Sequence, residues 1–455
     1  MNAPARGSTA TSSLPRVVAA SLIGTTIEWY DYFLYGTAAA LVFGKLFFPN
    51  TDPLTGTLLS FLTYAIGFAA RPIGALVFGH FGDRVGRKRL LVVSLLLMGG
   101  STTAIGLLPT YDSVGMAAPV LLTALRLVQG FALGGEWGGA VLLVSEHGDQ
   151  RRRGFWASWP QGGAPAGNLL AAGVLSLMTA VQSESAFLAW GWRVPFLLSA
   201  ALVGVGMWIR LAVEESPLFR QAVRNRPTTE PAPLVGVLTQ HWREVLVAMG
   251  ARMAENISYY VMTTFVLTYA VTHAHFDKQS ALNAVLIASA IQFALIPLFG
   301  ALSDRVGRKP VYLVGAAGVG VWAFVFFGMV DTRSFAQLVV AVTVGLVFHS
   351  AMYAPQAAFF SELFATRLRY SGASIGAQFA SVAAGAPAPL IATALLKDYG
   401  TATPVSVYVA IAAAVTVLAV LCGRETRGQD LAEVEERPAE EPSADGSPAV
   451  KPAVT

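Results

Sequence analysis

Charged residues are scarce in this chain of 455 residues. Asp, Glu, Lys and Arg together make up 13% of it, about half the share of a typical soluble domain. Apolar residues make up 54%, and the mean hydropathy is +0.56. A soluble fold of this length needs more charge to cover its surface. The scarcity therefore excludes an ordinary soluble enzyme and a disordered scaffold, and it favours a helical membrane protein with many spans.

Cysteine is almost absent as well. Cys422 is the only one, so no disulfide framework can form within the chain. The sequence also lacks a dense set of His and Cys with metal-ligand spacing, and it lacks a glycine-rich phosphate loop followed by Lys and Ser or Thr. We therefore expect no metal, no cofactor and no enzymatic activity.

Long apolar runs are what the sequence has instead. A helix needs about 20 apolar residues to cross a bilayer core of about 30 Å. Twelve such runs are bounded by charges, prolines or polar clusters. Their centres lie near Tyr30, Gly67, Met98, Gly130, Ala166, Leu202, Val261, Ser289, Val319, Val347, Gly385 and Ala413. The sequence therefore predicts an all-α membrane protein with twelve transmembrane helices.

Lys and Arg are distributed unevenly between the predicted loops. If the N-terminus lies in the cytoplasm, the loops on that side hold sixteen of them and the outer loops hold five. Because positive charge gathers on the cytoplasmic side, we expect both termini there. The basic loops then serve topology and contact with anionic lipid, and we expect no nucleic-acid partner.

A polar stretch with several prolines separates six predicted spans from six. The predicted organisation is a cytoplasmic N-terminal tail (1–16), a six-helix bundle (17–213), a cytoplasmic central loop (214–243), a second six-helix bundle (244–424) and a cytoplasmic tail (425–455). The last segment is rich in Glu, Pro and Ala and cannot bury a core, so we expect it to be disordered.

The two halves share a loop sequence. Gly79-His-Phe-Gly-Asp-Arg-Val-Gly-Arg-Lys follows the second span, and Gly300-Ala-Leu-Ser-Asp-Arg-Val-Gly-Arg-Lys follows the eighth, 221 residues later (300 minus 79). Matching loops at matching places indicate parallel repeats about an axis normal to the membrane. A basic loop that only sets topology is the alternative, but two copies in register argue against it.

The chemistry of the repeated loop suits a structural or gating role. Glycines permit tight turns, and Asp and Arg side chains can join neighbouring helix ends by charge-assisted hydrogen bonds. Two glutamates near the same ends of spans 4 and 10 are natural partners for them. The predicted network comprises Gly79, Asp83, Arg84, Gly86, Arg87, Glu146, Asp304, Arg305, Gly307, Arg308 and Glu362.

The repeated loop resembles the signature loop of the major facilitator superfamily, and this resemblance covers about residues 17 to 424. Arg126-Leu-Val-Gln-Gly130 resembles a second motif of that superfamily. The resemblance implies two pseudo-symmetric six-helix bundles, alternating access to a central cavity and a monomer.

Four more segments resemble the metabolite:proton symporter family, which includes carriers for proline and betaine, α-ketoglutarate, citrate and shikimate. They are Glu28-Trp-Tyr-Asp-Tyr-Phe-Leu-Tyr-Gly36, Ala70-Arg-Pro-Ile-Gly74, Gly134-Gly-Glu-Trp-Gly-Gly139 and Trp190-Gly-Trp-Arg-Val-Pro-Phe196. This second resemblance implies a multi-pass protein of a bacterial inner membrane, and it does not identify the substrate.

Ionisable residues inside spans are costly and mark functional sites. Glu28 and Asp31 of span 1 are three residues apart and share a helical face. At about 1.5 Å per residue, Asp31 and Arg126 of span 4 lie at similar depths, so they can pair. Burial favours the protonated carboxylic acid and an arginine favours the carboxylate, so we expect Asp31 or Glu28, with Arg126, to carry the coupling proton. A permanently ionised structural pair is the alternative.

Other polar residues in the spans are candidates for substrate contact. Arg252 and Glu255 of span 7 share a face, and they either contact the substrate or form a salt bridge within the helix. With Arg126 across the cavity, Arg252 suits an anionic group. The predicted substrate contacts are Tyr32, Tyr35, Arg126, Gln161, Arg252, Glu255, Asn256, Tyr353 and Gln378.

Two further features have modest predicted roles. Arg71 and Glu136 lie in the inner parts of spans 2 and 4 and are candidates for a gating or bracing pair. His349 of span 10 titrates in the physiological range, but a lone histidine in a span is more typical of hydrogen-bonded packing than of proton coupling.

These features predict a proton-coupled symporter that imports a small organic acid or a zwitterionic metabolite by alternating access. The arginines favour a carboxylate-bearing substrate. A proton-driven exporter is one alternative, because Gly163-Ala-Pro-Ala-Gly167 loosely resembles a motif of drug:proton antiporters. A membrane sensor that has lost transport is another, although the chain shows no output module. The expected partners are the substrate, the proton and the lipid bilayer.

Overall fold

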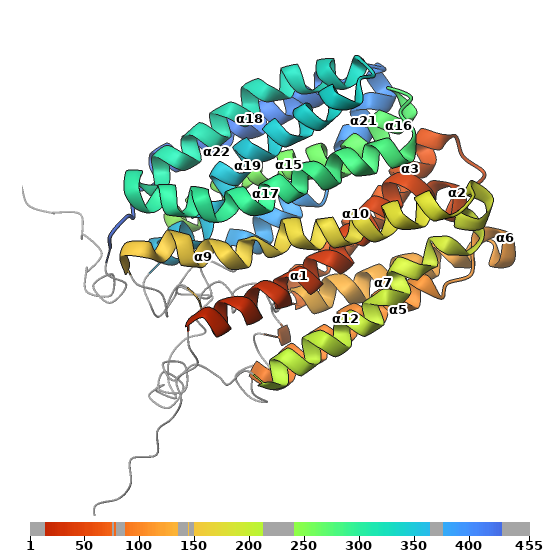
Figure 1. The fold of residues 1–455 in the computed structure, drawn as a ribbon, viewed down its shortest axis with the longest axis horizontal. Coiled ribbons are helices and arrows are strands. Elements are labelled where there is room, and N and C mark those ends of the chain that lie inside the picture. The colour runs from red at the N-terminus through yellow and green to blue at the C-terminus, as the bar shows by residue number, and fades with distance from the viewer. Residues whose placement is uncertain are drawn as a thin grey trace, which may run out of the picture.

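A computed structural model describes residues 14–74, 77–78, 87–134, 144, 150–212, 241–364 and 376–429. Every regular element in these ranges is a helix, and most of the helices run side by side as long rods (Figure 1). The repeated-loop residues Gly79, Asp83, Arg84 and Gly86 lie outside these ranges, and so do Glu136 and Glu146. Arg87 begins a helix, but its side chain is not described.

The amino-terminal half contains α1 (Leu14–Ala38), η1 (Ala39–Phe43), α2 (Gly44–Phe47), α3 (Pro53–Ala69), α5 (Arg87–Gly106), α6 (Tyr111–Val114), α7 (Ala117–Leu133), η2 (Gln150–Arg152), α9 (Arg153–Gln161), α10 (Gly163–Val181), α11 (Glu184–Ala186), η3 (Phe187–Gly191) and α12 (Arg193–Ala212). The carboxyl-terminal half contains α15 (Trp242–Tyr260), η4 (Val261–Phe265), α16 (Val266–Thr272), α17 (Lys278–Val306), α18 (Arg308–Asp331), α19 (Phe335–Leu363), η5 (Ser381–Gly385), α21 (Ala388–Tyr399) and α22 (Thr403–Cys422).

Several helices follow one another without a loop and form one rod, and the twelve rods coincide with the twelve predicted spans. In chain order, rods 1 to 6 are α1–η1–α2, α3, α5, α7, α9–α10 and α11–η3–α12, and rods 7 to 12 are α15–η4–α16, α17, α18, α19, η5–α21 and α22.

Not every rod is apolar throughout. By length and hydropathy alone, seven helical stretches qualify as membrane spans, or eight if Glu184–Gly191 and Arg193–Trp208, which meet at 42°, count as one. Two stretches are apolar but shorter over the described residues, namely Val92–Gly106 and Ala117–Leu133 of rods 3 and 4. Rods 1 and 7 do not qualify, and both carry buried ionisable residues, among them Asp31 and Glu255.

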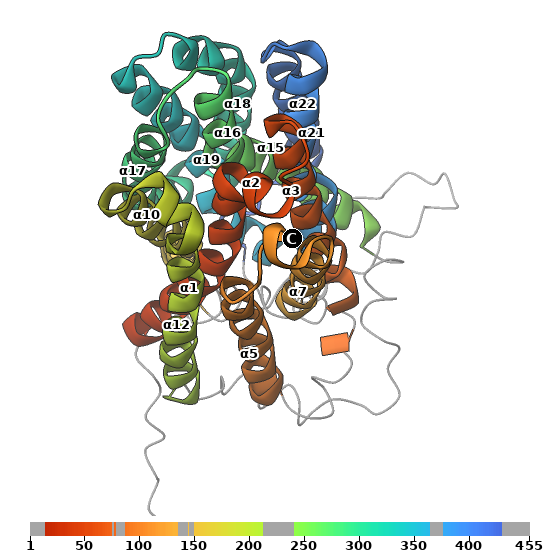
Figure 2. The same ribbon diagram turned by 90° about the vertical axis from the view of Figure 1, so that its right-hand side faces the viewer.

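The rods pack in the same order in both halves. In the first half, rod 1 contacts rods 5 and 6, rod 3 contacts rods 4 and 6, and rod 2 contacts rod 4. In the second half, rod 7 contacts rods 11 and 12, rod 9 contacts rods 10 and 12, and rod 8 contacts rod 10. Each contact recurs six rods later, which confirms two pseudo-symmetric bundles. Figure 2 shows α18, α19 and α22 on one side of the molecule and α1, α5 and α12 on the other.

Four rods make most of the contact between the bundles. Helices α9 and α10 of rod 5 pack against α17 of rod 8, and α3 of rod 2 packs against α21 and η5 of rod 11. Figure 1 shows α10 running beside α17 along the length of the molecule. The predicted domain boundaries stay a prediction, because residues 213–240 between the bundles lie outside the described ranges.

Glycines allow rods 2 and 4 to approach closely. A carbon built at the Cβ position of Gly130 would lie 1.6 Å from the carbonyl oxygen of Gly67, so a larger residue forces the two backbones apart. A carbon at the Cβ position of Gly67 would lie 2.7 Å from Cγ of Arg126. The glycines therefore place Arg126, one turn before Gly130, directly against rod 2.

We expect Gly130→Ala to lower the yield of folded protein and the melting temperature, because core overpacking costs about 1–3 kcal/mol. Gly100→Ala is the matched control, since an added methyl group there meets nothing within 4 Å. In a helix this exchange stabilises by about 1 kcal/mol. Thermal unfolding in detergent measures both variants. Equal melting temperatures for the two variants would show that the close approach of rods 2 and 4 does not matter.

Candidate functional site

A first cavity, which we call the bundle cavity, lies inside the amino-terminal bundle between rods 1, 2, 3 and 4. It has a volume of about 10 Å³, which is room for about one water molecule. Its wall includes Asp31, Tyr32, Arg71, Arg126 and Gln129. The fold thus brings the predicted acid and two of the predicted arginines to the wall of one small cavity.

Asp31 is almost fully buried, with 1% of its surface exposed. Ser199 of rod 6 donates a hydrogen bond of 2.5 Å to Oδ1, and Oδ2 has no hydrogen-bond partner among the described residues. Arg126 reaches the acid only indirectly. Its Nη1 donates to Gln129 at 2.8 Å, and Gln129 donates at 2.6 Å to Thr102, which lies beside the carboxylate. Arg126 and Asp31 therefore form no direct ion pair, and Gln129 and Thr102 lie between them.

Both arginines of the bundle cavity lie over aromatic rings. Cζ of Arg126 is 4.3 Å from the ring centre of Tyr35, and Cζ of Arg71 is 3.9 Å from that of Phe68. Tyr32 lies near both, at 5.3 Å from Arg126 and 4.8 Å from Arg71. Cation–π contacts recover part of the hydration that each guanidinium loses on burial.

Glu28 and Asp31 have different neighbours although they are one turn apart. Asp31 faces rod 6 inside its own bundle, where Ser199 binds it. Glu28 is buried as well, and it lies close enough to Tyr353 of rod 10 to act on it electrostatically. Asp31 and Glu28 thus have neighbours on different rods, Ser199 on rod 6 and Tyr353 on rod 10.

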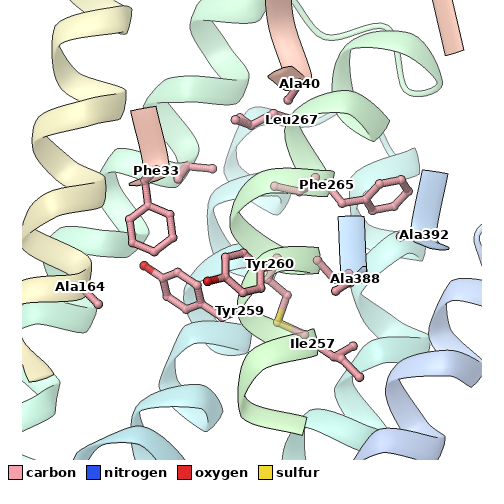
Figure 3. Close-up of a cluster of buried hydrophobic side chains, with 14 of the residues drawn as sticks. Phe33, Ala40, Ala164, Ile257, Tyr259, Tyr260, Phe265, Leu267, Ala388 and Ala392 are labelled. Atoms are coloured by element: carbon pink, nitrogen blue, oxygen red, sulfur yellow. The ribbon is translucent and has the colours of Figure 1, made fainter. Parts of the chain in front are cut away.

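A second cavity, which we call the central cavity, lies between the two bundles and also measures about 10 Å³. Rods 1 and 5 contribute Trp29, Phe33 and Ala164, and rods 7 and 10 contribute Glu255, Asn256, Tyr259, Tyr260, His349 and Tyr353. Figure 3 shows Phe33 directed at Tyr259 and Tyr260, with Ala164 beside them. Aromatic rings from both bundles thus close the central cavity down to the size of one water molecule.

The polar side of the central cavity is centred on Glu255. Arg252 Nε lies 3.5 Å from its carboxylate, so the predicted salt bridge within the helix is present. Asn256 donates to the same carboxylate at 3.0 Å and Gln356 donates at 3.3 Å. His349 Nε2 lies 3.4 Å from the other oxygen. The lone pairs of Glu255 are therefore well occupied.

His349 has a hydrogen-bonding partner at each ring nitrogen, which is the packing role predicted for it. Gln292 of rod 8 approaches Nδ1 at 2.8 Å through its amide nitrogen, and Nε2 faces Glu255. No spacing in the sequence predicts the pair of His349 and Glu255, because the two residues come from rods 10 and 7 and are 94 positions apart.

The remaining predicted contacts have mixed placements. Gln161 donates to the backbone oxygen of Tyr353 at 3.2 Å and so joins rod 5 to rod 10 across the bundles. Tyr35, whose ring contacts Arg126, shares a hydrogen bond of 2.5 Å with Thr63. Gln378 is buried, but it lines neither cavity. No group of His, Cys, Asp and Glu suited to a metal ion occurs in the part of the chain that the structure describes.

The second copy of the repeated loop joins the two bundles at their predicted cytoplasmic end. Asp304 at the end of α17 accepts hydrogen bonds from the backbone nitrogens of Gly154 at 2.8 Å and Phe155 at 2.9 Å. These nitrogens belong to the first turn of α9, where a carboxylate is favoured by unpaired N–H groups and by the helix dipole. Arg308 donates to Asp304 at 2.7 Å and fixes its orientation.

Glu362 is the centre of this cytoplasmic network and is fully buried. Arg308 lies 3.2 Å from its carboxylate, Arg153 of the other bundle lies 3.0 Å away, and Thr426 donates to it at 2.7 Å. Arg153 and Thr426 were not among the residues predicted for this network. Arg153 belongs to a basic run that signals only topology, and Thr426 lies in the segment predicted to be disordered.

The loop between α17 and α18 supports this arrangement. Gly307 has φ of +110°, which only glycine adopts readily, as the repeated loop predicts. Glu425 accepts hydrogen bonds from the backbone nitrogens of Arg308 and Lys309. Burial raises the pKa of Glu425, but these backbone hydrogen bonds outweigh it and hold the pKa below its ordinary value. Arg305 is exposed and takes no part in the cytoplasmic network.

Exposed ion pairs join the bundles at the opposite end. Lys278 lies 3.3 Å from Glu184, and Lys397 lies 3.7 Å from Asp52. Hydrogen bonds from Thr55, aided by Lys397, hold the pKa of Asp52 below its ordinary value. The Asp52 contact therefore persists in mild acid and is lost only when the pH falls below that lowered pKa. Such exposed pairs contribute little, because water and salt screen them.

Comparisons with known proteins agree with this architecture. The model of the Major Facilitator Superfamily matches residues 19–386 and 253–454. The inner membrane metabolite transport protein YhjE of Escherichia coli is 40% identical, over 92% of this chain and 96% of that protein. The shikimate transporter of the same organism is 36% identical, over 93% and 98%. Its proline/betaine transporter is 32% identical, over 92% and 85%.

Solved structures show the same fold. The proton:xylose symporter XylE superimposes with a TM-score of 0.73 over 93% of this chain and 98% of XylE, at 18% sequence identity. The curated relatives are transporters of small molecules and not enzymes, and the first is named for the inner membrane. This chain belongs to the Major Facilitator Superfamily and is a multi-pass membrane transporter.

Proposed function

We propose that this transporter couples the entry of a small organic acid or zwitterionic metabolite to the entry of a proton. The observation that carries the proposal is the burial of Asp31 in the wall of the bundle cavity, which has room for about one water molecule and which Arg126 and Gln129 also line. An ionisable group at such depth is retained for function and not for stability.

The protonation state of Asp31 affects Arg126 electrostatically. Protonation of Asp31 changes the charge of the bundle cavity by one unit, so Arg126 loses its nearest counter-charge. An anionic group of the substrate then replaces that charge. Proton and substrate thus favour each other's binding, and a ligand shifts an alternating-access equilibrium only through such a difference in affinity.

Both cavities hold about one water molecule, so the bundles must separate at one end to admit a metabolite. The cytoplasmic network resists separation at one end and the exposed ion pairs resist it at the other. Rocking of one bundle against the other opens one end at a time. The proposed orientation, with both termini in the cytoplasm, places the buried network on the cytoplasmic side.

The motif that favoured an exporter has a packing role. A Cβ carbon on Gly163 would lie 2.4 Å from Oγ1 of Thr25, and one on Gly167 would lie 2.6 Å from the backbone nitrogen of Tyr30. The two glycines let rod 5 lie against rod 1. Gly163-Ala-Pro-Ala-Gly167 therefore gives no support for export beyond its resemblance.

Proteoliposomes test the proposal. The probes are labelled shikimate, proline and glycine betaine, which the names of the relatives suggest. With acid outside, we expect accumulation of at least one probe, up to about tenfold per pH unit for one proton per substrate. An uncoupler should abolish it. Accumulation driven only by acid inside would indicate proton exchange and export, and uptake indifferent to the gradient would remove proton coupling.

A further inference from the structure

We propose that the bundle cavity is the subsite for the carboxylate of the substrate, and that Arg71 and Arg126 hold it together. This deepens the proposed function and rests on it. It assigns the anionic group of the substrate to one bundle, whereas the sequence placed it across the central cavity between Arg126 and Arg252. It also gives Arg71 a binding role in place of a bracing one.

Three buried polar atoms at the bundle cavity have no hydrogen-bond partner among the described residues. Arg71 and Arg126 are 6% and 3% exposed, and Nε of each lacks a hydrogen bond among the described residues. Oδ2 of Asp31 also lacks one. All three side chains line the bundle cavity. Leaving a buried donor unpaired costs about 1–3 kcal/mol, and more for a charged group, so such atoms point to a ligand.

The described wall of the bundle cavity carries an excess of positive charge. The described wall of the bundle cavity holds two guanidinium groups and one carboxylate, so one positive charge is left over, and two are left when Asp31 is protonated. The faces of Tyr32 and Phe68 compensate only part of this excess. A carboxylate balances it, and protonation of Asp31 strengthens the demand for one.

Both guanidinium groups lie close to the ring of Tyr32. Cζ of Arg71 lies 4.8 Å and Cζ of Arg126 lies 5.3 Å from the same ring centre, that of Tyr32. The two guanidinium groups, from rods 2 and 4, therefore lie near the same aromatic ring, and both line the bundle cavity. Planar guanidinium groups bind the two oxygens of a carboxylate through paired N–H donors, which a compact ammonium group does not match.

Arg252 is a weaker candidate for the same task. It lies 3.5 Å from Glu255 on its own helix, so its charge is already balanced there. Glu255 in turn accepts hydrogen bonds from Asn256 and Gln356. Among the described residues, the carboxyl-terminal bundle therefore contributes no excess cation to the central cavity, whereas the amino-terminal bundle contributes one to the bundle cavity.

Access to the subsite follows from the aromatic wall. Tyr32 of rod 1 and Tyr260 of rod 7 stand between the two cavities, with their ring centres 5.9 Å apart. Because the two rings belong to different bundles, separation of the bundles withdraws Tyr260 from Tyr32 and opens the bundle cavity to the central one. The carboxylate enters the subsite while the rest of the substrate lies against Trp29, Phe33 and Tyr259.

The test measures binding and stability without transport. Arg71→Gln, Arg71→Lys and the control Arg243→Gln, an exposed arginine of rod 7, are purified in detergent with the wild type. The probes are formate and acetate, with formamide and acetamide as neutral counterparts and chloride to hold ionic strength constant. Melting temperatures are recorded with and without each probe.

We expect both anions to raise the melting temperature of the wild type and of Arg243→Gln, and the amides to have no effect. Without a probe, Arg71→Gln should melt at or above the wild-type temperature, because it removes an unbalanced buried cation. Its apparent affinity for acetate should fall about 30-fold or more. The affinity of Arg71→Lys for acetate should lie between those of the wild type and Arg71→Gln, because lysine keeps the charge and loses the planar donors.

Two results would overturn the subsite. One is a lower melting temperature of Arg71→Gln without a probe, which a bracing role predicts. The other is that the anions raise the melting temperatures of the wild type and Arg71→Gln equally, or raise neither. Failure of the proposed function gives a different result. In that case proteoliposomes show no gradient-driven uptake, but the anions still bind at Arg71. Gradient-driven uptake together with no anion effect would refute the subsite alone.

Discussion

Asp31→Asn is expected to abolish substrate accumulation against a gradient while exchange of substrate across the membrane continues. Asparagine keeps the size of the side chain and the hydrogen bond with Ser199, but it cannot take up or release a proton at this depth. For a gradient of about two pH units, the accumulation ratio should fall about a hundredfold, to the level reached without a gradient. Uptake and counterflow in the same proteoliposomes measure the two activities.

The control for this variant is Asp112→Asn, an exposed carboxylate of α6. It should accumulate substrate as the wild type does. If Asp31→Asn keeps the pH dependence of the wild type, then Asp31 is not the coupling residue. In that event Glu28→Gln tests the other acid of rod 1, which faces Tyr353 of the second bundle.

Glu362→Gln is expected to have the largest structural effect. The substitution leaves Arg153 and Arg308 buried without their shared carboxylate. Breaking a buried ion pair by removing one partner costs about 3–5 kcal/mol, so the bundles should separate at the predicted cytoplasmic end. Spin labels on the ends of rods 5 and 10 measure this separation as a longer interbundle distance.

Glu184→Gln is the matched change at the other end of the molecule. It removes the carboxylate from an exposed pair with Lys278, so the expected effect is below about 1 kcal/mol. The same distance measurement applies to labels on the outer ends of rods 6 and 8. Equal displacements in the two variants would contradict the difference in burial on which both expectations rest.

The sequence was a good guide to the rods and to their symmetry. Apolar runs of spanning length, broken by charges, predict where each helix begins and ends, and two copies of one loop predict the repeat. The depth of Asp31 and Arg126 also followed from the helical rise, and both residues line the bundle cavity. These features depend on position along one helix, which a sequence displays directly.

Contacts between helices were much harder to predict. Ser199, Thr102 and Gln129 complete the surroundings of Asp31, but small polar residues are common in spans and have no characteristic spacing. His349 and Glu255 meet because rods 7 and 10 pack together, and neither position is unusual in its own helix. Helical spacing grouped Glu28 with Asp31, but it could not predict that their neighbours come from rods 10 and 6.

The two closures of this carrier differ in their exposure to dissolved ions. Electrolyte attenuates charge interactions beyond about 8 Å at physiological ionic strength, and most readily where water surrounds the groups. The pairs of Lys278 with Glu184 and of Lys397 with Asp52 are solvated, whereas Glu362 is sealed from solvent. High salt should therefore weaken the exposed ion pairs more than the buried network around Glu362. With the proposed orientation, the substrate-free transporter should then favour the outward-open state as the salt concentration rises.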